Sequence, residues 1–345
     1  MSGLPSRLLV TGGAGFIGSA FVRRVLGRHD DIRVTVLDKL TYAGNLANLS
    51  TVADDVRYRF VHGDINDQAL VGELAAGADA IVNFAAESHV DRSIEEPDAF
   101  IQTDVHGTFT LLEAARRNQH ARFVQVSTDE VYGNVPSGSS VESDGLRPRS
   151  PYSASKAGGD LLVQAYYTTY GVPAMITRAS NNFGPYQYPE KVIPLFVTNA
   201  IDGEQLPLYG DGQQVRDWLY VDDHCDAIEL ILARGEPGEI YNVGGGNELS
   251  NLDLTLRILD LTGRELSLVR RVPDRAGHDR RYSVDCTKIR ALGWGPVHAF
   301  DQALAETVRW YREHENWWRP LKSGEYLNYY RRQYGDRLAA STAIE

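Results

Sequence analysis

The stretch Arg7-Leu8-Leu9-Val10-Thr11-Gly12-Gly13-Ala14-Gly15-Phe16-Ile17-Gly18 decides the fold. Its first five residues suit a short buried strand, and apolar side chains recur at helical spacing after Gly18. Gly12, Gly15 and Gly18 allow a tight turn and a close approach of the backbone to a pyrophosphate. The start of the helix presents free N–H groups to the same anion. The stretch therefore predicts a strand, a turn and a helix that together bind a dinucleotide.

A second predicted strand, Arg33–Leu37, ends at Asp38, which lies 20 residues after Gly18. A carboxylate at this place binds the ribose 2′-hydroxyl of a dinucleotide and repels a 2′-phosphate. Asp38 therefore favours NAD over NADP, although Lys39 beside it weakens that preference.

Strands and helical segments alternate through the first half of the chain. The further predicted strands are 58–62, 79–84, 122–126 and 174–178. Apolar strands between helices are typical of a parallel sheet covered on both faces. We expect an α/β fold, with a Rossmann-like doubly wound parallel sheet and a smaller mixed α/β C-terminal lobe. Residues 1–180 would form the NAD-binding domain with the catalytic residues, and residues 181–345 mainly the substrate lobe, with some chain returning to the first domain.

Composition limits the partners and the compartment. The chain has 345 residues, 43% of them apolar, and a net charge of −11, which argues against nucleic acid or an anionic membrane as the main partner. It has no run of 18 apolar residues and no signal peptide, so we expect a cytoplasmic protein. Cys225 and Cys286 are isolated, so we expect free thiols and no metal site.

Tyr152 and Lys156 are four residues apart, so a helix projects both from one face. A nearby ammonium lowers the pKa of a tyrosine, which would make Tyr152 a base for alcohol oxidation. Thr128 could hydrogen-bond the same hydroxyl. Taken alone, the spacing fits equally well a helix start after Pro151 with an ordinary surface lysine.

Asp129 and Glu130 follow Thr128 and are not needed for a plain alcohol oxidation, so they suggest a second reaction on the oxidised intermediate. Two adjacent carboxyls reach different protonation states easily, because ionising both is unfavourable. Successive residues of a strand point to opposite faces, so both can reach one substrate only if the chain bends where the strand ends.

Ligands of parallel sheets bind beyond the carboxyl ends of the strands. Asp64, Ala85, Ala86 and residues 127–130 lie at such ends and should share one crevice, although Asp64 alone would suit a turn. The second half of the chain has irregular segments at 181–186, 209–212 and 242–247, which are typical of substrate pockets. Six arginines of this half could bind a pyrophosphate or be solvated; they are Arg216, Arg270, Arg271, Arg275, Arg280 and Arg281.

With these motifs, the chain resembles the dTDP-glucose 4,6-dehydratases of the extended short-chain dehydrogenase/reductase superfamily over nearly its full length. The motifs that carry the resemblance are residues 11–18, 38–45, 85–91, 127–133, 152–156, 181–187, 209–212, 215–218 and 277–282. The triplet Thr128-Asp129-Glu130 discriminates best, because the glycines and the Tyr/Lys pair belong to the whole superfamily. The related epimerases lack the acidic pair.

The resemblance implies a role for each matching residue. Thr128, Asp129, Glu130, Tyr152 and Lys156 would be catalytic. Tightly bound NAD would be held by Gly12, Gly15, Phe16, Ile17, Gly18, Asp38, Lys39, Thr41, Asp64, Ile65, Ala85, Ala86, Thr103, Tyr152 and Lys156. The nucleotide sugar would be held by Ser88, Thr128, Asn181, Lys191, Val192, Pro207, Tyr209, Arg216, Asn251, Arg275, His278 and Tyr282. His278, taken alone, could equally be a surface histidine.

The implied reaction converts dTDP-glucose to dTDP-4-keto-6-deoxyglucose. Dehydration of another nucleotide hexose, 4-epimerisation and a non-catalytic NAD-binding role are the alternatives. The resemblance also implies a homodimer that pairs the helices of residues 105–118 and 152–166 in a four-helix bundle, although both could simply pack on the sheet. Three residues depart from the family pattern. Asp104 replaces the usual Asn, Phe183 the usual Tyr, and Val192 the usual Leu.

Overall fold

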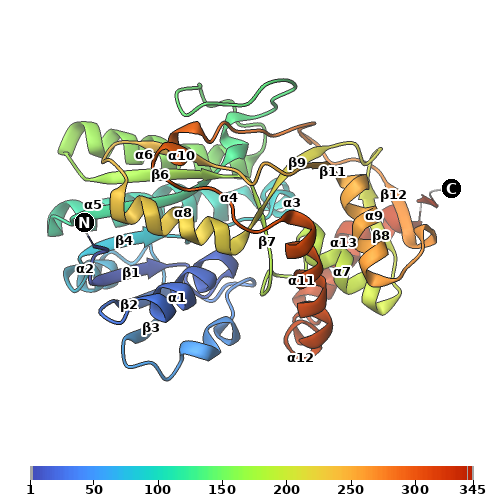
Figure 1. Ribbon diagram of the computed structural model, residues 1–345, viewed down its shortest axis with the longest axis horizontal. Coiled ribbons are helices and arrows are strands. Elements are labelled where there is room, and N and C mark those ends of the chain that lie inside the picture. Colours follow the sequence, from blue (N-terminus) through green and yellow to red (C-terminus); the bar gives the residue numbers. More distant parts are fainter. Residues whose placement is uncertain (1–2, 340, 344–345) are drawn as a thin grey trace.

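The computed structural model describes residues 3–339 and 341–343. A seven-stranded sheet with helices on both faces fills one end of the molecule, and a smaller group of helices and short strands fills the other, where the chain ends (Figure 1).

The large sheet is parallel throughout, with strand order β10-β6-β5-β4-β1-β2-β3. Its strands are β1 Arg7–Thr11, β2 Arg33–Asp38, β3 Tyr58–His62, β4 Ala80–Asn83, β5 Arg122–Thr128, β6 Ala174–Ala179 and β10 Ile240–Val243. Two three-stranded sheets have the orders β11-β9-β7 and β13-β12-β8. Their strands are β7 Asn181–Phe183, β8 Leu206–Tyr209, β9 Val215–Tyr220, β11 Glu248–Ser250, β12 Val269–Val272 and β13 Thr342–Ala343.

The α-helices are α1 Phe16–Arg28, α2 Gln68–Ala76, α3 Val90–Glu95, α4 Pro97–Phe100, α5 Thr108–Asn118, α6 Pro151–Tyr170, α7 Val192–Asp202, α8 Val221–Arg234, α9 Asn251–Thr262, α10 Thr287–Ala291, α11 Phe300–Glu313, α12 Glu315–Trp318 and α13 Glu325–Ala339. The short helices are η1 Leu46–Val52, η3 Asp129–Tyr132, η4 Leu266–Leu268 and η5 Pro320–Lys322, which are 3₁₀, and η2 Ile101–Gly107, which is a π-helix.

Alternation along the strands divides the core of the large sheet into two layers. Leu8 and Val10 of β1 pack with the apolar face of α1 and α8, whereas Leu9 packs with α2, α5 and α6 on the other face. A third apolar cluster joins α7, α9 and α11 in the smaller part of the molecule. The Rossmann-like doubly wound sheet predicted from the strand pattern is confirmed.

The three segments predicted to be irregular are partly strands, and Tyr209, the first residue of the second segment, ends β8. Asn181–Phe183 forms β7, and Asn242 and Val243 end β10 at the edge of the large sheet. Asn242 is fully buried and suits a strand because its side chain accepts a hydrogen bond from Tyr132 Oη (2.8 Å) and donates one to the Ser140 carbonyl (3.0 Å). A polar residue in a strand therefore concealed the strand in the sequence.

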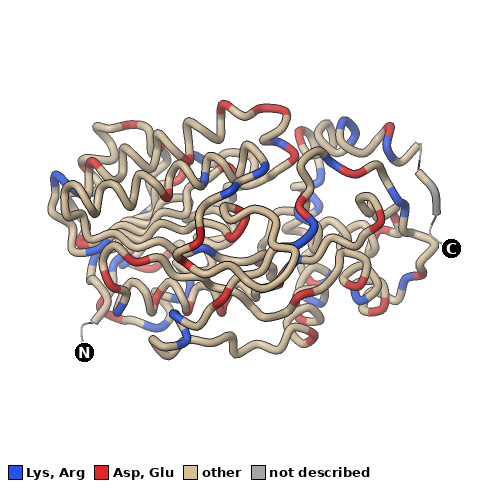
Figure 2. Tube along the Cα trace, turned by 90° about the horizontal axis from the view of Figure 1, so that it is seen from above, with Lys and Arg blue, Asp and Glu red and all other residues tan. Residues whose placement is uncertain are grey.

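Acidic and basic residues are interspersed along the trace, with no long stretch of one sign (Figure 2). Within the part of the chain that the structure describes, no helix has the length and apolarity needed to cross a membrane.

Candidate active site

A cavity of about 410 Å³ lies beyond the carboxyl ends of β1, β2, β4 and β5 and extends to β8 and α7. Every residue predicted to be catalytic or to hold the cofactor lines it, and so does every predicted substrate residue except Tyr282. Segments that are far apart in the sequence therefore meet in one crevice, as the strand-end argument predicted.

The glycine turn packs so closely against its neighbouring backbone that Gly12 and Gly18 have no space for a side chain. Gly12 has φ +68°, and a Cβ there would lie 2.5 Å from the Ala85 nitrogen. A Cβ on Gly18 would lie 2.4 Å from the Gly12 carbonyl oxygen. Helix α1 begins immediately after Gly15 and has no side-chain cap, so its first N–H groups are available to an anion. This backbone cradle fits a pyrophosphate.

Asp38 stands at the end of β2, beside the glycine turn. Its carboxylate accepts hydrogen bonds from the backbone N–H groups of Ala14 (2.9 Å) and Leu40 (2.8 Å), which fix its position. Burial raises its pKa, and these two amides offset part of the rise. A fixed carboxylate at this place fits a ribose diol, as predicted.

Asp64 combines two roles that the sequence left as alternatives. Its Oδ1 accepts from the Asn66 N–H (2.9 Å), which is a turn contact, while Oδ2 pairs with Lys39 Nζ (2.7 Å) at the cavity wall. Lys39 is thus neutralised by Asp64.

The chain bends at the point that the acidic pair requires. Strand β5 ends at Thr128, and Asp129 begins the 3₁₀ helix η3. Thr128 Oγ1 accepts from the Glu130 N–H (3.2 Å) and donates to Asp129 Oδ1 (3.3 Å), which stabilises the bend. Because of this bend, both carboxyls line the same cavity.

Asp129 is in an environment that favours its neutral form. It is 3% exposed, and its Oδ2 has no hydrogen-bond partner in the described structure. Burial, followed by the charges of Glu130 and Asp217, raises the pKa of Asp129 well above its ordinary value. This environment favours the protonated form of Asp129, which can donate a proton.

Tyr152 and Lys156 project from the first turns of α6, which begins with Pro151 and a capping box formed by Ser150 and Ser153. Lys156 is 4% exposed, and its Nζ donates to the Val126 carbonyl oxygen (2.8 Å). Lys156 is therefore not an ordinary surface lysine.

The expectation that Lys156 lowers the pKa of Tyr152 is wrong for this structure. Burial, followed by the charges of Glu130 and Asp104, raises the pKa of Tyr152 well above its ordinary value, and a hydrogen bond with Thr128 offsets only part of the rise. The sequence revealed the ammonium and the nearby Glu130, but not that burial would raise the pKa of Tyr152 more than any other cause.

Asp104 belongs to the π-helix η2, which packs against α6. It is 1% exposed, its Oδ2 accepts from Ser155 Oγ (2.6 Å), and its Oδ1 has no partner in the described structure. Burial raises the pKa of Asp104 from 3.8 to about 6, although Lys156 offsets part of the rise. Burial and then Asp104 raise the pKa of Glu87, at the cavity wall, to about 7.

Replacing Asp104 with Asn should change how stability depends on pH. Because the folded-state pKa of Asp104 is raised, its stabilising contribution is complete below 3.8 and is lost as the pH rises through about 6. Relative to the wild type, Asp104→Asn should therefore gain roughly 2–3 kcal/mol between about pH 4 and pH 7. Urea unfolding of both proteins at the two pH values measures this difference. If the free energy of unfolding of Asp104→Asn differed from that of the wild type by the same amount at pH 4 and pH 7, the titration assigned to Asp104 would be wrong.

The far end of the cavity is basic. Arg216 is 5% exposed, its Nη2 donates to the Asp279 carbonyl oxygen (3.0 Å), and its guanidinium lies 4.2 Å from the ring centre of Tyr282. Tyr282 packs against Arg216 and does not line the cavity, so its predicted contact with the substrate stays a prediction. It also hydrogen-bonds Glu130 Oε2 (3.4 Å).

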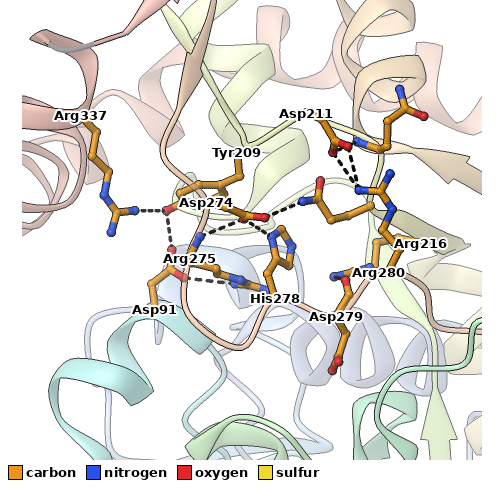
Figure 3. A network of polar contacts seen from close by, with 12 residues as sticks. Asp91, Tyr209, Asp211, Arg216, Asp274, Arg275, His278, Asp279, Arg280 and Arg337 are labelled. Carbon is orange, nitrogen blue, oxygen red and sulfur yellow. Dashed lines mark hydrogen bonds and ion pairs between the residues drawn. The ribbon is translucent and has the colours of Figure 1, made fainter.

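His278 is not a surface histidine. Its side chain is 5% exposed, and its Nδ1 is 2.6 Å from Asp274 Oδ1. Burial, followed by the charge of Arg275, lowers the pKa of His278 to about 4, so the ring is neutral at pH 7. Figure 3 shows these residues with their partners around the loop that carries them. Arg280, in contrast, is exposed and pairs with exposed Asp211. It is therefore one of the solvated arginines that the sequence analysis allowed.

Several cavity residues were not predicted from the sequence; they are Glu87, His89, Asp91, Asn182, Gln187, Tyr188, Glu190, His224 and Tyr334. Glu87 to Asp91 follow the end of β4, so the strand-end argument could have placed them at the cavity. Tyr334 belongs to α13, and no local pattern relates it to a cavity formed mostly by the first half of the chain.

The structure shows the surroundings of two further residues that depart from the family pattern, Phe183 and Val192. Phe183 is buried against the rings of Trp218, Tyr220 and Phe300, so it needs no hydroxyl partner. Val192, the first residue of α7, lines the cavity, where it leaves slightly more room than Leu.

Known proteins share this architecture. The sequence profile of the family described as GDP-mannose 4,6 dehydratase matches residues 9–307. A dTDP-glucose 4,6-dehydratase of Streptomyces niveus is 56% identical over 322 residues, which are 92% of this chain and 96% of that protein. The low-salt glycan biosynthesis protein Agl12 of Haloferax volcanii is 55% identical over 88% of this chain and 98% of its own.

A crystal structure of DesIV, a dTDP-glucose 4,6-dehydratase of Streptomyces venezuelae with NAD and TYD bound, is 59% identical. It superimposes with a TM-score of 0.90 and covers 92% of this chain and all of that one (100%). Identity of this level over nearly the whole length of both chains agrees with the motifs, the sheet and the cavity. The chain belongs to the dTDP-glucose 4,6-dehydratases, within the extended short-chain dehydrogenase/reductase superfamily.

Proposed function

We propose that the protein is an NAD-dependent hydro-lyase that converts dTDP-D-glucose to dTDP-4-keto-6-deoxy-D-glucose. The observation that carries the proposal is the bend after Thr128, which brings Asp129 and Glu130 into the same cavity as Tyr152 and Lys156. Relatives named dTDP-glucose 4,6-dehydratase support it.

The first step is oxidation at C4 of the glucosyl group. Bound NAD⁺ supplies the acceptor for the C4 hydride and later the hydride for C6. Tyr152 takes the proton of the C4 hydroxyl, with Thr128 hydrogen-bonded to it and Lys156 beside it. The positive charge of bound NAD⁺ would lower the raised pKa of Tyr152.

The second step removes water across C5 and C6. The ketone at C4 acidifies the C5 hydrogen, and Glu130 takes it as a proton. Asp129, which burial keeps protonated, gives its proton to the C6 hydroxyl, which leaves as water. As hydride reaches C6, Glu130 returns a proton to C5. Transfer of the C4 hydroxyl proton from Tyr152 to Asp129 then restores both groups for the next turnover.

At the nucleotide end, Arg216, Arg275 and Lys191 would bind the diphosphate, and Tyr209 would lie against the base. The relatives that are dTDP-glucose 4,6-dehydratases favour thymine as this base. Incubating the purified protein with dTDP-, UDP-, CDP- and GDP-hexoses tests the choice. Loss of one water from dTDP-glucose at the highest kcat/KM is the expected result. Preference for another nucleotide would overturn the substrate, and a product of unchanged mass would indicate 4-epimerisation.

We also propose a homodimer formed through α5 and α6. Leu111, Leu112 and Ala115 of α5 are buried in the chain's own core, but α6 leaves Leu161 (57% exposed) and Ala165 on its outer face. A second copy of this face would bury them in a four-helix bundle.

The dimer gives a specific expectation. The wild type should sediment as a dimer at micromolar concentration, and Leu161→Glu should sediment as a monomer because the charge would be buried in the interface. Val56→Glu, at a residue 98% exposed and away from α6, is the matched control and should remain dimeric. A monomeric wild type would contradict the proposal.

We further propose a division into an NAD-binding domain of residues 1–180 and a mainly substrate-binding lobe of residues 181–345, with β10 and α8 as the returning chain. Two buried free cysteines, Cys225 and Cys286, support a reducing cytoplasmic setting.

A further inference from the structure

Asp91 is a buried carboxylate that the proposed chemistry does not use. It lies in the first turn of α3, just after β4, and its side chain is 5% exposed. Burial alone would raise its pKa, but His89, Arg275 and a hydrogen bond from Tyr209 outweigh burial and lower the pKa of Asp91. Asp91 is therefore charged at neutral pH, inside the protein and at the wall of the cavity.

Both oxygens of Asp91 are fully engaged with the other part of the molecule (Figure 3). Oδ1 accepts from Arg275 Nη1 (3.1 Å), and Oδ2 accepts from Tyr209 Oη (2.9 Å) and Gln333 Nε2 (2.9 Å). Gln333 and Arg337 of α13 also donate to Tyr209 Oη, at 2.6 Å and 3.1 Å. One carboxylate thus joins strand β8, the loop after β12 and the last long helix.

The partner arginine keeps donors for a ligand. Arg275 lines the cavity, and its Nε is buried without a hydrogen-bond partner in the described structure. Burial lowers the pKa of Arg275, but Asp91 more than compensates and keeps the guanidinium charged. Asp91 binds one nitrogen of the Arg275 guanidinium, Nη1, and leaves its other nitrogens available to an oxyanion.

From this arrangement we infer that Asp91 is a positioning residue, which orients Arg275 and Tyr209 for the diphosphate and base of the nucleotide. The inference rests on the proposed function of the same site and adds a residue that acts through two others. A guanidinium that is already fixed loses less side-chain entropy when the anion binds, so the effect falls on affinity. Within the described residues, Asp91 makes its hydrogen bonds and ion pair with Tyr209, Arg275 and Gln333, and none with the cofactor end or the proton-transfer residues.

The test compares Asp91→Asn with Asp211→Asn. Asp91→Asn preserves shape but removes the charge and places an amide donor against the donors of Gln333. KM for dTDP-glucose should rise about 10- to 100-fold, as expected for losing a hydrogen bond to a charged group, while kcat changes less than about threefold. Asp211 pairs with Arg280 in solvent, so Asp211→Asn should leave KM within about twofold.

Calorimetry with dTDP separates this inference from the proposed reaction, because it needs no turnover. Asp91→Asn should weaken dTDP binding by the same factor as it raises KM, with unchanged NAD content. Tyr209→Phe gives a second route if Asp91→Asn does not fold. It removes one donor to the same carboxylate, so it should weaken dTDP binding about 3- to 10-fold. Wild-type dTDP affinity in folded Asp91→Asn, or in Tyr209→Phe, would overturn the inference. A wild type that binds dTDP but leaves dTDP-glucose unchanged would refute the reaction and not the positioning role.

Discussion

Glu130→Gln should reduce the dehydration rate by about 10²- to 10⁴-fold, the contribution of a well-placed general base. Oxidation at C4 should persist, because Tyr152 is unchanged. It should even proceed at lower pH, because Glu130 is the largest charge contribution that raises the pKa of Tyr152. Mixing the variant with dTDP-glucose should therefore produce the absorbance of reduced cofactor without loss of water.

Glu265→Gln is the matched control for this variant, because Glu265 is exposed and lies outside the cavity. Its turnover should stay within about twofold of the wild type. Full dehydration by Glu130→Gln would show that another group removes the C5 proton, and the roles of the acidic pair would then need to be reassigned.

Tyr152→Phe should stop the reaction one step earlier. The phenyl ring keeps the edge contact with Phe100, whose ring centre is 6.3 Å away, so the fold should be preserved. Without the hydroxyl there is no base for the C4 alcohol. Both the absorbance of reduced cofactor and dehydration should fall by about 10²- to 10⁴-fold.

Comparing the two variants separates oxidation at C4 from the loss of water. Tyr152→Phe should show neither reduced cofactor nor product, whereas Glu130→Gln should show the first without the second. Tyr167→Phe, at an exposed position of the same helix, should match the wild type. If Tyr152→Phe still oxidised C4, Tyr152 would not be the base.

Local signals in the sequence predicted much of the fold. Arg7–Thr11 and Tyr58–His62 are strands at the bounds that their apolar residues predicted. The crevice also followed from sequence, because all parallel strands of one sheet end at the same edge. Strand β10 was missed because Asn242 lowers strand propensity, and its partner Tyr132 is remote in the chain.

The electrostatics of the site could be predicted only in part. The charged groups could be identified from the sequence but their burial could not, so a lowered pKa was predicted for Tyr152 where the structure has a raised one. For Asp129 the prediction of a protonated acid agrees in direction with the structure, because burial and the neighbouring Glu130 act in the same sense. Asp91 contacts Gln333 of α13, which lies 242 residues further along the chain. No local sequence pattern encodes a contact over that separation.

The most direct test of the central claim uses dTDP-glucose labelled with deuterium at C4, incubated with the purified protein without added NAD. The expected product has lost one water and carries the deuterium at C6, since the hydride taken from C4 returns within the same site. Mass spectrometry and NMR of the nucleotide sugar measure both properties. A labelled sugar of unchanged mass, or a dehydrated product that has lost the deuterium to solvent, would contradict the account.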